Sequence, residues 1–144
     1  TVLSVAVDRA TWAAVGRSGS SACRVVDAVN RTERSFAVDA LANPSKGDWA
    51  NYIKGLVVEL QTRGIAVPGF HAAIGSTVPM SAGMSSSAAL EMAMLLGLVR
   101  LAGADIDWRD LARIVQACEN RYVGAKTGLL DQFSSLKGKA GCPV

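Results

Sequence analysis

A run of small residues at positions 78–91 has the composition of a phosphate-binding loop. It reads Val-Pro-Met-Ser-Ala-Gly-Met-Ser-Ser-Ser-Ala-Ala-Leu-Glu, and good helix formers continue to residue 102. The first turn of a helix carries free backbone N–H groups and a partial positive charge, which together suit an anion. Gly83 lets the backbone approach a ligand closely, and the three serines add hydroxyl groups without bulk. The residues predicted to bind phosphate are Gly83, Ser85, Ser86, Ser87 and Ala88.

A helix that begins at a serine cap and binds nothing is the simpler interpretation of this loop, because serine is common at that position. A P-loop is excluded, since no Lys-Ser or Lys-Thr pair follows the glycine. The loop resembles the phosphate-binding motif of the GHMP kinases, which include galactokinase, homoserine kinase, mevalonate kinase and phosphomevalonate kinase. Met84 replaces the leucine of that motif and Ser81 a frequent glycine, while the three serines before Ala88 are most similar to the galactokinase branch.

Two further segments resemble galactokinases and occur in the same order. Residues 117–133 read Ala-Cys-Glu-Asn-Arg-Tyr-Val-Gly-Ala-Lys-Thr-Gly-Leu-Leu-Asp-Gln-Phe. They are similar to Ala-Glu-Asn-Glu-Phe-Val-Gly followed by Gly-Ile-Met-Asp-Gln-Phe, with Arg121 in place of a glutamate and Thr127 where cysteine is common. Residues 49–56 read Trp-Ala-Asn-Tyr-Ile-Lys-Gly-Leu and are similar to Trp-x-x-Tyr-x-x-Gly. Because three matches in order are hard to explain by accident, the chain is identified as a member of this family.

The resemblance implies a two-layer α+β, ATP-binding N-terminal domain, similar to the second domain of ribosomal protein S5, of which residues 1–144 form a part. It implies transfer of the γ-phosphoryl group of MgATP, with Mg²⁺ as cofactor, to the anomeric hydroxyl of a small sugar, galactose before others. A kinase for arabinose, N-acetylgalactosamine or a heptose is an alternative, as is a non-catalytic sensor of sugar and ATP. The family signature Gly-Glu-His-Thr-Asp-Tyr-Asn, its nearby arginine and a C-terminal glycine-rich motif do not occur in the chain. We therefore expect the 144-residue chain alone to lack sugar kinase activity.

The resemblance also assigns roles toward the two substrates. Asp131 corresponds to the catalytic aspartate that contacts the sugar hydroxyl, either as a general base or as an electrostatic group. Gly128 corresponds to a glycine whose backbone lies near the sugar. An N-cap for the following turn is the alternative for Asp131. Trp49 corresponds to a tryptophan of the adenine pocket, with packing in the core as the alternative.

The expected magnesium ligands are Glu119 and Ser87. Mg²⁺ is usually held by one or two carboxylates together with phosphate oxygens and water. The family places a glutamate at the position of Glu119, and the last serine of the phosphate motif points to Ser87, with Ser86 as its competitor. The alternative for Glu119 is a solvated residue near the end of a helix, where an anion is locally unfavourable.

The composition is that of a globular chain rather than a nucleic-acid or membrane protein. Half of the residues are hydrophobic, 19% are charged, and the net charge is +3 without a dense basic run, so we expect no nucleic-acid partner. The apolar run at 92–99 is far shorter than the roughly 20 residues that cross a membrane, so we expect no membrane partner. The three cysteines lack metal-ligand spacing and are interpreted as free thiols in a cytoplasmic protein.

These segments must be positioned by a sheet and three main helices. Apolar runs predict strands over 2–8, 11–16, 23–28 and 35–38, plausibly an antiparallel meander, and a further strand over 70–74. Helices are predicted over 49–63, after Asp48 as a cap, and from the serines to residue 101. Asp107 is the predicted N-cap of a third helix that ends near residue 120. Runs of strands with segregated helices favour an α+β fold.

Overall fold

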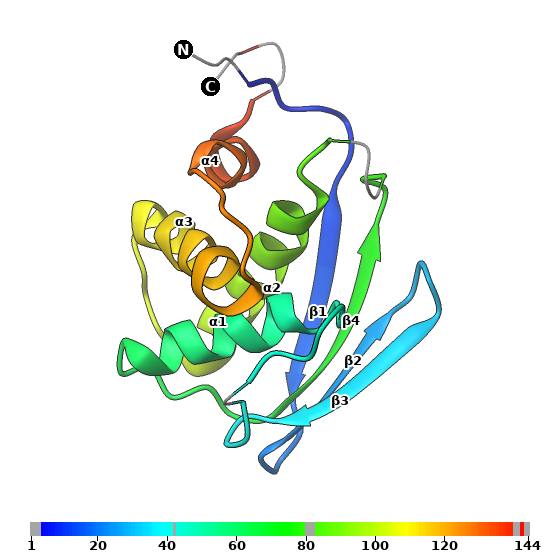
Figure 1. The fold of residues 1–144 in the computed structure, drawn as a ribbon, viewed down its shortest axis with the longest axis vertical. Helices are drawn as coiled ribbons and strands as arrows, with labels where there is room; N and C mark the ends of the chain where they lie inside the picture. The colour runs from blue at the N-terminus through cyan, green and yellow to red at the C-terminus, as the bar shows by residue number, and fades with distance from the viewer. Residues whose placement is uncertain (1–3, 42, 80–82, 140–141, 143–144) are drawn as a thin grey trace.

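Four strands form one mixed sheet, and the described helices lie together over one of its faces (Figure 1). The structure is a computed structural model that describes residues 4–41, 43–79, 83–139 and 142. The strands are β1 Thr11–Arg17, β2 Ala22–Asp27, β3 Thr32–Ala37 and β4 Phe70–Ser76. Their order is β1-β4-β2-β3, with β2 parallel to β4 and the other two pairs antiparallel. The predicted two-layer α+β architecture is confirmed.

The predicted antiparallel meander is wrong, because β4 lies between β1 and β2. Among the described strands, only β2 and β3 are consecutive in the chain and paired with each other. Gly69, which precedes β4, passes so close to the β1–β2 turn that an added Cβ would lie 2.1 Å from the carbonyl oxygen of Ser20. The N–H of Ser18 donates to the Gly69 carbonyl at 2.9 Å. The turn that was expected to join neighbouring strands therefore crosses the end of a third strand.

The strand predicted over 2–8 is also wrong within the described residues 4–8. This segment holds only an isolated bridge residue, Val5, and residues 1–3 lie outside the described part. Ser4 meets Ser134 of the last helix, with 2.6 Å between their hydroxyl oxygens, so the segment runs toward that helix. Val5 and Val7 are 59% and 55% exposed, and their apolar pattern is not used in the core.

In the described part of the chain, four α-helices and one π-helical turn make the second layer. They are α1 Asn51–Thr62, α2 Ser86–Ala102, α3 Trp108–Ala117, the π-helix η1 Cys118–Val123, and α4 Leu130–Lys137. Asp107 caps α3 as predicted, since its carboxylate accepts a hydrogen bond from the N–H of Arg109 at 2.9 Å. The helix expected from Trp49 begins at Asn51 with Ala50 as its N-cap residue, so the predicted Asp48 cap is wrong; the Asp48 carboxylate accepts from the N–H of Ala50 in the preceding turn at 3.1 Å. No described helix has the length and apolarity to cross a membrane.

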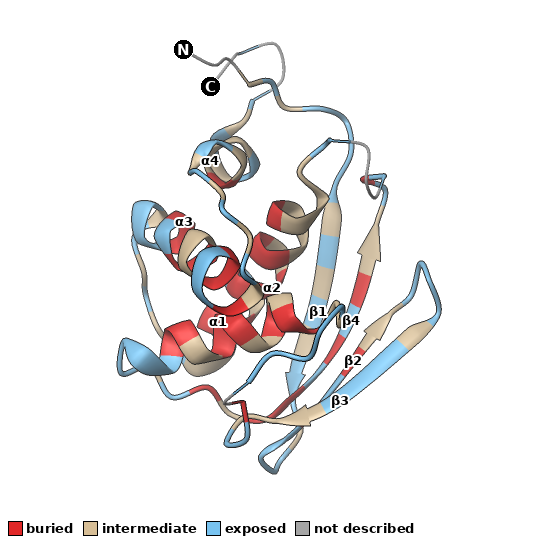
Figure 2. Ribbon diagram, viewed as in Figure 1, coloured by how far each residue is buried: buried red, intermediate tan, exposed pale blue. Residues whose placement is uncertain are grey.

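The core lies where the helical layer faces the sheet (Figure 2). The predicted stripes are buried: Ile53, Leu56, Val57 and Leu60 on α1, and Leu111, Ile114, Val115 and Cys118 on α3 and η1. On β4 the side chains alternate between buried and exposed up to Ile74, as expected of a sheet covered on one face. The helices are therefore fixed on the sheet by their apolar faces, and their ends carry the candidate site.

Candidate active site

The serine loop, residues 83–87, enters α2 through a left-handed backbone. Ser85, at the N-cap position, has φ +55° and makes no side-chain capping bond, and Gly83 has φ +67°. The serine-capped helix that was the simpler interpretation is therefore not formed through Ser85. The N–H of Ala89 donates to the Ser85 carbonyl at 3.0 Å, so the N–H groups before it have no acceptor within the helix. A non-glycine residue held in this conformation is typical of ligand-binding sites.

Glu119 lies in the π-helical turn and receives three side-chain hydrogen bonds. Its side chain is buried, and the residue is 3% exposed. The hydroxyl of Ser87 donates to Oε1 at 3.0 Å. The hydroxyl of Thr127 and the amide of Gln132 donate to Oε2 at 2.5 Å and 2.9 Å. Glu119 is thus joined to Ser87 of the serine loop, and the alternative of a solvated residue at a helix end is wrong, while its role as a magnesium ligand stays a prediction.

A second buried carboxyl, Glu91, lies one helical turn after Ser87 on α2. It is 0% exposed, and neither of its side-chain oxygens has a hydrogen-bond partner among the described residues. Burial raises the pKa of Glu91 to about 9, although the Cys118 thiol opposes the shift and the neighbouring Glu119 adds to it. Burial likewise raises the pKa of Cys118, whose thiol donates to the carbonyl of Tyr52 at 3.2 Å. At neutral pH Glu91 is therefore an uncharged acid beside a hydrogen-bonded carboxylate.

The oxygens of Ser87 and Glu119 fit the edge of a magnesium coordination shell. Adjacent ligands of an octahedral Mg²⁺ with bonds of 2.0–2.1 Å lie about 2.9 Å apart. The Ser87 Oγ and Glu119 Oε1 atoms are 3.0 Å apart. Within the described residues no cluster of three or more His, Cys, Asp or Glu side chains could hold a metal. This donor set suits Mg²⁺, which takes few protein ligands and fills its shell with phosphate and water.

Asp131 and the serine loop line the same cavity, of about 620 Å³. Gly83, Ser85 and Asp131 contribute to its wall, together with the segment that precedes β1. Asp131 lies in the first turn of α4, is half-buried, and its carboxylate has no hydrogen-bond or ion-pair partner among the described residues. It does not cap the helix, so the N-cap alternative is wrong. Gly128 is exposed, and an added Cβ there would meet nothing within 4 Å.

Trp49 lies apart from that cavity, and its ring packs partly against the core. The guanidinium of Arg34 stands 5.9 Å from the centre of the ring. The indole Nε1 is buried without a hydrogen-bond partner among the described residues. Trp49 therefore makes the core contact that was the alternative to adenine binding. Its role in the adenine pocket stays a prediction.

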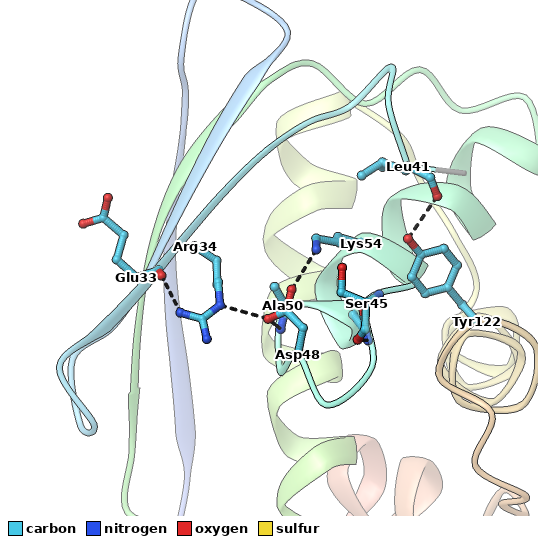
Figure 3. A network of polar contacts seen from close by, with 9 residues as sticks. Glu33, Arg34, Leu41, Ser45, Asp48, Ala50, Lys54 and Tyr122 are labelled. Carbon is cyan, nitrogen blue, oxygen red and sulfur yellow. Dashed lines mark hydrogen bonds and ion pairs between the residues drawn. The ribbon is translucent and has the colours of Figure 1, made fainter. Parts of the chain in front are cut away.

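The loop before α1 is tied down by a polar network (Figure 3). Burial alone would raise the pKa of Asp48, but hydrogen bonds from Lys54, Ala50 and Arg34 outweigh it and hold that pKa below its usual value. The Lys54 and Arg34 contacts measure 2.8 Å and 3.0 Å. The hydroxyl of Tyr122, in η1, donates to the Leu41 carbonyl at 3.0 Å. The loop is therefore bound to β3, to α1 and to the turn that carries Glu119.

Three residues of this site escaped the sequence analysis as functional candidates: Glu91, Thr127 and Gln132. Glu91 is the only charged residue between Ser86 and Val99 of α2. A charge on the buried face of an apolar helix, four residues after Ser87, was the available signal. Thr127 had been noticed only as a departure from cysteine. Gln132 carried no signal beyond its place beside Asp131.

Residues 51–139 match the family model of the GHMP kinases N terminal domain. A galactokinase of Roseiflexus sp. (strain RS-1) is 37% identical over 139 residues, which is 96% of this chain and 35% of that protein. A galactokinase of Bacillus subtilis (strain 168) is 33% identical over 96% of this chain and 36% of its own length. The crystal structure of Lactococcus lactis galactokinase complexed with galactose superposes with a TM-score of 0.86 at 26% identity, over 92% of this chain and 35% of that one. The chain therefore spans only 35% to 36% of the length of these relatives.

Proposed function

This chain belongs to the GHMP kinase family, and we propose that it supplies the phosphate-binding, magnesium-binding and sugar-activating part of a galactokinase-like sugar kinase. The observation that carries the proposal is the contact of Ser87 with Glu119 at 3.0 Å. It joins the serine loop to a buried carboxylate, and its O···O separation is compatible with two ligands of one Mg²⁺ as well as with the hydrogen bond itself. The same loop shares a cavity with Asp131, whose carboxylate has no partner among the described residues. The serine loop therefore both bonds to Glu119 and shares a cavity wall with Asp131, which supports assigning phosphate, cation and acceptor to neighbouring positions.

The side chains and backbone divide the work of phosphoryl transfer, which depends on positioning and on neutralising charge. The free N–H groups at the start of α2 bind nucleotide phosphate oxygens. Ser87 and Glu119 would hold Mg²⁺, which offsets the phosphate charge when bound. Asp131 faces the acceptor, where it orients the sugar hydroxyl and accepts its proton. Trp49 is assigned to the adenine side of the nucleotide.

Galactose is the proposed acceptor and ATP the proposed donor. The support is the identity with galactokinases over nearly the whole chain. The Lactococcus lactis galactokinase, which shares the fold, was crystallised with galactose. Arabinose, N-acetylgalactosamine and heptoses are the competing acceptors to include in any assay. We place the protein in the cytoplasm.

A chimera tests the catalytic assignment. The chain replaces the matching segment of the Roseiflexus galactokinase, and phosphorylation of galactose is followed with MgATP. We expect the chimera to turn over galactose, and Asp131→Asn to lower kcat by roughly 10²–10⁴-fold, the range for a lost acid–base group. The dissociation constant of an ATP analogue should stay unchanged. A folded chimera without turnover, or an Asp131→Asn variant as fast as its parent, would refute the proposal.

A further inference from the structure

We propose that Thr127 and Gln132 are positioning residues that hold one oxygen of Glu119, so that its other oxygen faces the cation together with Ser87. This inference rests on the proposed magnesium site and goes beyond it by naming what orients its carboxylate. Neither residue is assigned as a ligand of the cation or as a contact to substrate. Their effect is transmitted entirely through Glu119.

The hydrogen bonds divide unequally between the two carboxylate oxygens. Oε2 accepts from the Thr127 hydroxyl at 2.5 Å and from the Gln132 amide at 2.9 Å. Oε1 accepts from the Ser87 hydroxyl alone among the described residues, at 3.0 Å. The terminal torsion of a glutamate is broad and does not fix the carboxylate by itself. Two donors on one oxygen supply that orientation and leave Oε1 free to exchange its single hydrogen bond for a metal bond.

Thr127 is itself held in place by its backbone. Its N–H donates to Oδ1 of Asn120 at 2.8 Å, and its carbonyl accepts from Nε2 of Gln116 at 3.2 Å. Both partners lie on the same continuous stretch of α3 and η1 as Glu119. The hydroxyl of Thr127 is therefore fixed relative to the carboxylate that it binds.

Gln132 connects the same carboxylate to α4. Its side chain is 0% exposed, and its own Oε1 is buried without a partner among the described residues. Exchanging the amide nitrogen and oxygen would set two oxygens against each other at Glu119, so the charge of Glu119 decides the orientation of the amide. Asp131 is the preceding residue of α4. The bond therefore also sets the position of the sugar-facing carboxylate relative to the magnesium ligand.

The test uses the purified 144-residue chain and Mn²⁺–ATP, a paramagnetic substitute for MgATP. Thr127→Val removes the hydroxyl with little change in shape, Thr127→Ser restores it, and Gln132→Met removes the amide. Matched controls are Thr62→Val and Gln61→Met at the C-terminal end of α1. Their side chains donate to the backbone carbonyls of Val58 and Val38. Mn²⁺ binding is measured from water-proton relaxation, and the melting temperature of each variant is recorded.

We expect Thr127→Val and Gln132→Met each to weaken Mn²⁺ binding by roughly 10–100-fold, the usual effect of losing a group that orients a metal ligand. Thr127→Ser and both controls should bind as the unchanged chain does. If Glu119→Gln abolishes binding while folded Thr127→Val and Gln132→Met variants retain it, this inference is wrong and the magnesium site stands. If Glu119→Gln binds normally, or the unchanged chain shows no relaxation enhancement, the site and the inference both fall. Gln132→Met acts on the same oxygen as Thr127→Val, so one unfolded variant does not leave the proposal undecided.

Discussion

Replacing Glu91 with glutamine should flatten the pH dependence of the chain's stability between pH 6 and pH 8. Burial raises the pKa of Glu91 from its ordinary value of 4.5 to about 9. The folded chain therefore keeps a proton on Glu91 in this range, while the unfolded chain has lost it. Stability from this group is complete below the ordinary pKa and falls as the pH rises toward the folded pKa.

The size of the effect follows from one proton. A difference of one bound proton changes the free energy of unfolding by about 1.4 kcal/mol per pH unit, or about 2.7 kcal/mol from pH 6 to pH 8. Glutamine does not titrate, so Glu91→Gln should lose this part of the slope. The absolute stability of the variant also contains the cost of a buried amide, and for that reason the two slopes are compared rather than the two stabilities.

Urea unfolding at pH 6, 7 and 8 measures both slopes. Glu33→Gln is the control, because its carboxylate is bound by Arg24 at 2.6 Å and 2.7 Å and its pKa is lowered, chiefly by that hydrogen bond. Glu33 is ionised in both states across this range, and its removal should leave the slope unchanged. If Glu91→Gln and the unchanged chain lose stability in parallel as the pH rises, Glu91 is not a neutral acid in the folded chain.

Two further substitutions test the packing that holds the site. Tyr122→Phe should lower the free energy of unfolding by about 1–2 kcal/mol and speed amide exchange in the loop before α1, because the buried Leu41 carbonyl loses its 3.0 Å partner. Denaturation and hydrogen exchange measure the two effects, and an unchanged exchange rate would contradict the anchoring role. Gly97→Ala should destabilise the chain by about 1–3 kcal/mol, because the new Cβ would lie 2.6 Å from Cγ2 of Val15 on β1. An unchanged melting temperature would show that α2 and β1 can move apart to accept the methyl group.

Sequence reasoning succeeded where the signal is local. The apolar stripe that ends at Cys118 and the cap at Asp107 depend on neighbours a few residues away, and both are confirmed. The strand order failed because it depends on where β4 inserts, and the close approach of Gly69 to Ser20 joins residues far apart in the chain. Glu91 was missed because burial of a lone carboxyl depends on which helices cover it.

The side chains around Glu119 also had to be seen in space. The link from Ser87 to Glu119 spans 32 positions, and it was expected only through the family resemblance. The bonds from Thr127 and Gln132 span 8 and 13 positions and pass through a loop without regular structure. No periodicity connects such residues, so nothing in the pattern of the chain grouped them.

The π-helical turn Cys118–Val123 holds one residue more than an α-helical turn would. Its carbonyl at Glu119 accepts from the N–H groups of Gly124 and Ala125, farther along the chain than an α-helix allows. Deleting one residue would return the turn to α-helical winding, and because the wider turn holds one residue more over nearly the same sweep, the segments on either side would keep their relative orientation. Thr127 would then stay beside Glu119 if the deleted residue were the exposed Arg121, but not if it were Asn120, whose Oδ1 accepts from the N–H of Thr127. The turn should therefore absorb the loss of Arg121 more readily than a substitution of Asn120, although both positions are exposed.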